Sequence, residues 1–165
     1  MKTLYIIITF FASYTTLLAQ EELIQIGASG FDGVYDVAIG KDKSIYTTGF
    51  FQGTLEGLKS KGNYDAFVAK YNTDQTIQWI HQLGSEYRNK NEVTEFGKFI
   101  VTDSHQDIYV TGLFYDQLED KNKKTASTGK QDIFIVKYDQ NGTKKWTQTL
   151  GSEGSEHIEL SLIHI

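Results

Sequence analysis

The chain has 165 residues, a formal net charge of −5 and no cysteine. The absence of cysteine excludes disulfides, cysteine-based zinc sites and thiol nucleophiles, and the mild acidity argues against a nucleic-acid partner, which needs a basic face. The sequence contains 10 Tyr, 10 Phe, 15 Gly and no Pro, a composition that favours strands joined by turns of Gly, Asn and Asp.

The first segment has the pattern of a targeting signal. Met1 and Lys2 give a positive start, an uncharged apolar run extends from Leu4 to Leu18, and the small residue Ala19 precedes Gln20. This is the plan of a secretory signal peptide, for which we expect a helix over residues 1–19. The run is shorter than the ~20 residues of a membrane span, although an uncleaved anchor helix is the alternative. We therefore expect an exported chain with no membrane span after cleavage.

Two blocks of the remaining sequence recur. Ile45–Phe51 parallels Ile108–Phe114, 63 positions later, and Asp65–Tyr71 parallels Asp132–Tyr138, 67 positions later. The two offsets differ because the connection between the blocks is longer in the second copy, and insertions are tolerated in such a loop. At the second offset Trp79 also parallels Trp146, and 83–86 parallels 150–153. Repeats of this length indicate a propeller or a solenoid.

Each unit contains four short apolar-rich runs between turn residues, and no window shows a sustained helical period. The runs are Val34–Ile39, Ser44–Phe51, Tyr64–Tyr71 and Thr76–Leu83, then Phe96–Thr102, Asp107–Phe114, Gln131–Tyr138 and Thr143–Leu150. Asn141-Gly142 predicts a type I′ hairpin turn, whereas the matching Asp74-Gln75 lacks the glycine and is expected to turn less tightly. Four antiparallel strands per repeat are typical of a propeller blade. We expect an all-β fold, a partial β-propeller of about two complete blades plus a closing strand.

Alternation within the third strand predicts which side chains lie between blades. Phe67, Ala69 and Tyr71 share one face of the strand, and Ala66, Val68 and Lys70 share the other. Aromatic side chains at fixed repeat positions are expected to anchor neighbouring blades, each contributing about 2–3 kcal/mol by burial. These anchors are Phe67 with Phe134 and Trp79 with Trp146; stacking on a sugar ligand is the alternative.

Together these residues resemble the SBBP repeat, a β-propeller repeat of secreted bacterial proteins with a D-x-F-V-x-K-Y block, then Gly and Trp, an acidic residue and V-Y-V-T-G. The resemblance covers about Leu23 to Glu159, and the signal ending Leu17–Gln20 is similar to those of Bacteroidota. The family usually has Asp before its second strand; Asp103 keeps it and Gly40 does not, which weakens any ligand role there. The structural repeat positions that the resemblance implies are Asp32, Gly49, Asp65, Phe67, Lys70, Tyr71, Trp79, Glu95, Gly112, Asp132, Phe134, Lys137, Tyr138, Gly142, Trp146 and Glu156.

The expected organisation is a signal peptide at 1–19, a closing strand at 20–27, blade 1 at 28–86, blade 2 at 87–153 and the start of blade 3 at 154–165. Leu23–Gly27 aligns with Ile80–Gly84, so Leu23–Ile26 is predicted to close a ring with strands further downstream. Propellers have about 4 to 8 blades, which makes further blades of the same protein the expected partners. Residues 160–165 resemble an adaptor-encoded, non-native tail; a genuine first strand of blade 3 is the alternative.

The polar residues form no recognisable catalytic or metal-binding motif. The four histidines, His81, His105, His157 and His164, lack ligand spacing, so solvated or turn positions are expected. Oxygen ligands in the predicted loops could touch calcium, but turn formation is favoured there; these residues are Asp42, Asn72, Asp74, Asp139 and Asn141. The basic run Lys121–Lys124 is expected in a solvated loop, and no Gly-x-Ser-x-Gly elbow occurs.

The sequence thus predicts an exported, non-catalytic module that binds an unidentified protein or glycan or serves as a scaffold at the cell surface, without a cofactor. Two alternatives stay open. One is a secreted carbohydrate-active or other propeller enzyme with its catalytic part elsewhere, and the other is a calcium-stabilised adhesin.

Overall fold

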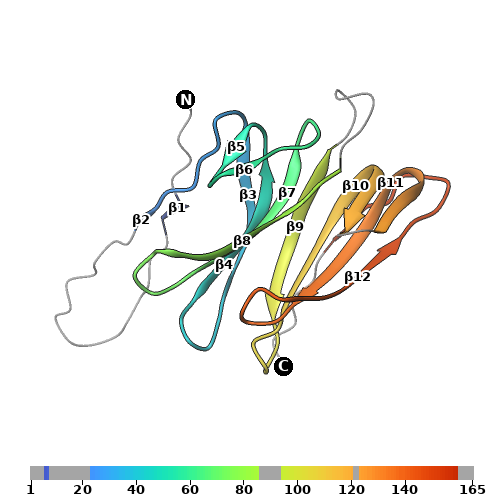
Figure 1. Ribbon diagram of the computed structural model, residues 1–165. Coiled ribbons are helices and arrows are strands. Elements are labelled where there is room, and N and C mark those ends of the chain that lie inside the picture. The colour runs from blue at the N-terminus through green and yellow to red at the C-terminus, as the bar shows by residue number, and fades with distance from the viewer. Residues whose placement is uncertain (1–5, 8–22, 86–93, 121–122, 160–165) are drawn as a thin grey trace.

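The computed structural model describes residues 6–7, 23–85, 94–120 and 123–159. The fold is all-β and its sheets are antiparallel (Figure 1). Within these ranges there is no helix, and so none that is long and apolar enough to cross a membrane.

Two four-stranded sheets make up most of the molecule, and each is a meander in which strands neighbouring in sequence pair in space. The first sheet contains β3 (Asp32–Ile39), β4 (Ile45–Phe51), β7 (Asp65–Tyr71) and β8 (Ile77–Leu83). The second contains β9 (Glu95–Thr102), β10 (Ile108–Asp120), β11 (Lys123–Tyr138) and β12 (Lys144–Leu150). All eight predicted strands are confirmed. They form because alternating β-branched and aromatic residues suit a pleated, half-buried surface.

Two short antiparallel pairs of strands complete the described structure. β1 (Ile6–Ile7) pairs with β2 (Leu23–Ile24), and β5 (Thr54–Leu55) pairs with β6 (Leu58–Lys59) between β4 and β7. Of the residues predicted to form the signal helix, the structure describes only Ile6–Ile7, and these form the strand β1. The rest of that segment and the predicted tail at 160–165 lie outside the described residues. The predicted closing role of Leu23–Ile26, with strands further downstream, stays a prediction.

The sheets stack face to face, with the second sheet (yellow to red) beside the first (blue to green) in Figure 1. In β7 the side chains of Ala66 and Val68 join the cluster between the sheets, whereas Phe67, Ala69 and Tyr71 join a cluster on the opposite face. The predicted alternation is therefore confirmed. The cluster between the sheets consists of Tyr46, Ala66, Val68, Leu83, Ile100, Ile108, Val110, Phe114, Leu118, Phe134, Val136 and Tyr138.

The outer face of the second sheet is open in the described structure. Trp146 is 38% exposed and Leu150 is 57% exposed, while Ile133 and Ile135 are half-buried. Trp79, by contrast, packs against the cluster between the sheets. The expected anchoring by Trp146 is therefore absent here, since within the described ranges no third sheet covers that face.

The long β10–β11 hairpin corrects one prediction. From the sequence, the first of these strands is expected to end at Phe114 and the second to begin at Gln131, with the basic run Lys121–Lys124 in a loop. Instead, pairing continues past a bulge to Asp120 and Lys123, so part of the basic run lies in β11. Asp116, at the bulge, has a φ of 61°.

The turns correct a second prediction. Asn141-Gly142 does not form a type I′ turn, because only Gly142 has a positive φ, 78°. Gly142 N donates to Asp139 O and Asp139 N donates to Thr143 O, both at 2.9 Å, which is a type I turn followed by a left-handed residue. The same pair of hydrogen bonds recurs at 40–44, 72–76 and 103–107.

In those three turns the left-handed position is held by Lys43, Gln75 and Gln106, with φ of 63°, 69° and 64°. The turn at Asp74-Gln75 therefore has the same hydrogen bonds as the one with glycine, contrary to the prediction. A type I′ turn does occur between β5 and β6, where the two loop residues Glu56 and Gly57 have φ of 46° and 83°.

Candidate functional site

A buried polar cluster lies where the chain passes from the first sheet to the second. An isolated parallel bridge joins Tyr64 to Thr94, and Glu95 N donates to Tyr64 O at 2.9 Å. This pairing places the first residue of β9, Glu95, beside the first residue of β7, Asp65. Both carboxyl groups are fully buried. The junction thus brings together two of the acidic repeat positions predicted from sequence.

Asp65 is held by donors from the loop before β7. The backbone N–H groups of Lys61 and Gly62 donate to its carboxylate at 3.1 Å, and Gln82 Nε2 donates at 2.5 Å. Burial raises the pKa of Asp65 above its ordinary value, and hydrogen bonds from Gly62, Gln82 and Lys61 offset this only in part. A Cβ at Gly84 would lie 2.0 Å from Asp65 Oδ2, so the carboxylate occupies the space of the missing side chain.

Glu95 has one satisfied and one unsatisfied oxygen. Its Oε1 lies 2.9 Å from Ser85 Oγ, whereas Oε2 is buried and has no hydrogen-bond partner among the described residues. Burial, together with the negative charge of Asp65, raises the pKa of Glu95 to about 9.

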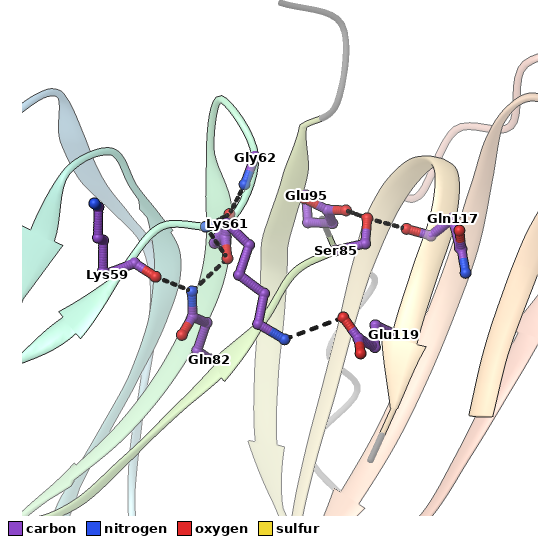
Figure 2. Close-up of polar contacts among 9 residues, drawn as sticks. Lys59, Lys61, Gly62, Gln82, Ser85, Glu95, Gln117 and Glu119 are labelled. Atoms are coloured by element: carbon purple, nitrogen blue, oxygen red, sulfur yellow. Dashed lines mark hydrogen bonds and ion pairs between the residues drawn. The ribbon is translucent and has the colours of Figure 1, made fainter. Parts of the chain in front are cut away.

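Contacts from β10 tie this cluster to the second sheet, as Figure 2 shows. Ser85 Oγ donates to Gln117 O at 2.6 Å, and Lys61 Nζ lies 3.2 Å from Glu119 Oε2. Both β10 residues belong to the part of the strand beyond Phe114, which the sequence analysis missed. These residues are polar, so the sequence carries no strand signal here. The strand continues because β11 pairs with it.

The same arrangement recurs at the end of the second sheet. Thr128 N donates to Asp132 Oδ2 at 2.8 Å, and Glu156 N donates to Gln131 O at 3.0 Å. Ser152 Oγ lies 2.5 Å from Glu156 Oε1, as Ser85 lies beside Glu95. At the start of the first sheet, Ala28 N donates to the predicted acidic position Asp32 at 3.2 Å. The acidic repeat positions therefore join successive segments of the chain.

The turn between β11 and β12 forms a second contact between the sheets. Lys70 Nζ and Trp79 Nε1 each donate to Gln140 O at 3.3 Å. His81 Nε2 lies 2.7 Å from Gly142 O, and its ring stacks on Tyr138 with centroids 5.1 Å apart. His81 is thus a packed residue and not a solvated one, and burial lowers its pKa.

The remaining predicted repeat positions have packing roles. Gly49 and Gly112 allow close backbone approach, since a Cβ there would lie 1.9 Å from Gly33 O and 2.1 Å from Phe96 O. Lys137 Nζ lies 2.7 Å from Asp107, whose carboxylate raises the pKa of the lysine. Tyr71 is buried, as are Phe67, Phe134 and Tyr138, and burial raises the pKa of Tyr71.

The aspartates considered for calcium instead accept hydrogen bonds from their own turns. Asp42 accepts from Ser44 N at 3.0 Å, Asp74 from Thr76 N at 3.0 Å, and Asp139 from Thr143 N at 2.9 Å. Asp103 likewise accepts from the backbone of the turn that it opens. The described ranges contain no group of three or more His, Cys, Asp or Glu side chains that could hold a metal ion.

No family model matches the chain. A search of curated proteins also finds no match.

Proposed function

We propose that the chain is an exported, non-catalytic β-propeller module, related to SBBP repeats, that acts as a scaffold or binding surface at the cell surface. One observation carries this proposal. Two copies of one sequence repeat fold into matching four-stranded meanders that stack face to face, and the outer face of the second carries apolar residues at the repeat positions that are covered in the first.

Equivalent side chains on the two faces support the proposal. Ala66 and Val68 are fully buried between the sheets, while their equivalents Ile133 and Ile135 are only half-buried. Burial of apolar surface drives such stacking, and repeat proteins need a neighbour or a cap on each such face. A further sheet of the same kind, from the same protein, fits the outer face.

The chain after β12 supports the same reading. Ser155 forms a parallel bridge with Gln131, as Thr94 does with Tyr64 where the second sheet begins. Glu156 then occupies the place that Glu95 occupies at the first residue of β9. We infer from this correspondence that residues 154–156 lead into a third sheet of the same kind.

The carboxyl groups of the candidate site favour a structural role over catalysis. Asp65 and Glu95 are fully buried, and a general acid or base must reach its substrate. The pattern at 1–19 supports export, and we infer that the ligand is a protein or glycan bound on the assembled module.

The open outer face is tested with a hydrophobic dye. We expect the chain to bind anilinonaphthalene sulfonate in its folded state, and the variant Ile133→Thr/Ile135→Thr/Trp146→Gln to lose most of that signal while keeping its unfolding midpoint. The matched control Ala66→Thr/Val68→Thr/Trp79→Gln changes the covered face and should unfold the chain. Equal loss of stability in both variants would contradict an open stacking face.

Export is tested separately. Expression in a bacterium with a secretory pathway should yield a chain whose N-terminus, read by mass spectrometry, is Gln20. The variant Ile7→Arg places a charge in the apolar run and should remain uncleaved inside the cell. An intact Met1 on exported protein would contradict a cleaved signal.

A further inference from the structure

The hydroxyl of Ser85 has two oxygen neighbours at the junction, Glu95 Oε1 and Gln117 O, while the backbone of Ser85 also donates to Glu95. The Ser85 hydroxyl has one hydrogen, and Gln117 O, which lies 2.6 Å away, can only accept it. The contact between Ser85 Oγ and Glu95 Oε1 at 2.9 Å then needs a hydrogen from the glutamate. A protonated carboxyl group supplies it, whereas a carboxylate would face the serine oxygen with no hydrogen between them.

The charges around Glu95 agree with this assignment. Asp65, from β7, already accepts hydrogen bonds from Lys61, Gly62 and Gln82, so it is the carboxyl group better suited to carry the negative charge. The ammonium group of Lys61 pairs with Glu119 of β10. Tyr64, on the remaining side, offers its backbone oxygen to Glu95 N.

We propose that Glu95 is a proton-binding site, and that stacking of the second sheet on the first takes up one proton there. A divalent cation is the competing ligand for the unpartnered Oε2. Calcium takes about 6 to 8 oxygen ligands, whereas the oxygens of Asp65 are already used by N–H donors. A proton satisfies the site with no further ligand.

The equivalent serine–glutamate contact at the end of the second sheet, Ser152 with Glu156, has no stacked sheet beside it in the described residues. There Ser152 Oγ donates to Glu156 Oε1 at 2.5 Å and Ser152 N donates to the same oxygen at 3.0 Å. Because Ser152 gives its own hydrogens to Glu156 Oε1, this contact needs no hydrogen from the glutamate. At the first junction, Gln117 of the stacked sheet takes the serine hydrogen instead. Proton uptake therefore accompanies stacking and not the folding of a single sheet.

The sign of the pH effect follows from the raised pKa of Glu95. Its ordinary value is 4.5 and its value in the fold is about 9. Below 4.5 both the folded and the unfolded chain hold the proton. Between 4.5 and 9 only the folded chain holds it, so the unfolding equilibrium constant rises with pH, by up to tenfold per pH unit. Above 9 this dependence ends.

The variant Glu95→Gln tests the proposal, since its side-chain N–H₂ can donate to Ser85 Oγ as the protonated acid does. We expect the urea midpoint of the unmodified chain to fall between pH 5 and 9, and that of Glu95→Gln to fall much less, with only the contribution of Asp65 left. The control Glu119→Gln removes the carboxylate that pairs with Lys61 and should keep the pH slope of the unmodified chain.

A direct measurement keeps the test independent of whether the variant folds. Infrared spectra of the unmodified chain at pH 7 should contain the C=O stretch of a buried, protonated carboxyl group, which ionisation near pH 9 removes. The proposal is overturned if that band is absent at pH 7, or if Glu95→Gln retains the full pH slope. Calcium-dependent stabilisation at pH 8, abolished by a chelator and absent from Glu95→Gln, would also overturn it in favour of a metal site.

Discussion

Acidic residues and glycines form matched pairs in this repeat. The Asp65 carboxylate occupies the space in which Gly84 lacks a Cβ, and Asp132 stands in the same relation to Gly151. A side chain at either glycine would push a buried carboxylate away from its N–H donors. This explains at the residue scale why a glycine, Gly84 or Gly151, follows the fourth strand of each unit.

Gly84→Ala should therefore be costly. The added Cβ would lie 2.0 Å from Asp65 Oδ2, so we expect a loss of about 2–3 kcal/mol in the free energy of unfolding, measured by urea denaturation. Gly27→Ala is the matched control, because Gly27 holds the equivalent position and no atom would lie within 4 Å of its Cβ. A cost at Gly27 equal to that at Gly84 would contradict the steric explanation.

The left-handed turn positions give an opposite prediction. Gln106 has a φ of 64°, which an L side chain adopts at a cost of about 1–2 kcal/mol, while glycine adds about 0.5–1 kcal/mol of backbone entropy on folding. Gln106→Gly should therefore stabilise the chain by about 0.5–1 kcal/mol. Gly142→Ala should destabilise it, since φ is 78° and the new Cβ would lie 2.8 Å from the Trp79 ring. Thermal midpoints shifting in the same direction for both variants would contradict this account.

At the scale of elements, the sequence predicted the strands well because each is a short run of alternating apolar residues. It missed the continuation of β10 to Asp120 and of β11 back to Lys123, where polar residues dominate and the partner strand decides the pairing. The type I′ prediction failed at Asn141-Gly142 because loop length, and not the dipeptide alone, selects the turn. The acidic repeat positions were found, but the role of Ser85 and Gln117 was not, since residues far apart in sequence meet only in the fold.

The fourth strands of the two sheets, β8 and β12, differ in what covers them. The same substitution at the equivalent residues Trp79 and Trp146 should therefore cost unequal amounts of unfolding free energy. In β8, Trp79 packs on the sheet interface and bonds Gln140 of the opposing turn, so Trp79→Ala should cost about 2–4 kcal/mol. In β12, Trp146 is 38% exposed, so Trp146→Ala should cost less than about 1 kcal/mol. Urea unfolding followed by far-UV circular dichroism measures both. Equal costs would mean that the second face is covered too.

On the scale of the whole molecule, the stack has different chemistry inside and outside. Between the sheets the clustered side chains are apolar, and at their junction the neutral acid Glu95 lies beside the buried carboxylate of Asp65, while the hairpin turns carry aspartates that reach solvent. Asp74 and Asp139 have a pKa below the ordinary 3.8, because hydrogen bonds from Thr76 and from Lys145 favour their ionised forms. Their stabilising effect is present above pH 3.8 and is lost as pH falls through their lowered pKa values.

These opposing groups predict a stability maximum on the acidic side of neutrality. The turn aspartates lose their effect below 3.8, and Glu95 loses its own progressively as pH rises from 4.5 to 9, with Asp65 acting in the same direction as Glu95. His81, whose pKa is lowered by burial, acts in the opposite direction to Glu95 below pH 6.5, so we expect the urea midpoint to peak between pH 4.5 and 6.5. Salt distinguishes the two limbs of the profile. At 1 M NaCl the Asp139–Lys145 ion pair is screened, with a Debye length of about 3 Å, whereas the Thr76 hydrogen bonds of Asp74 and the buried acid are not. The acid limb should flatten in part with salt and the alkaline limb should persist; an alkaline limb that vanishes with salt would mean that it arises from surface charge instead.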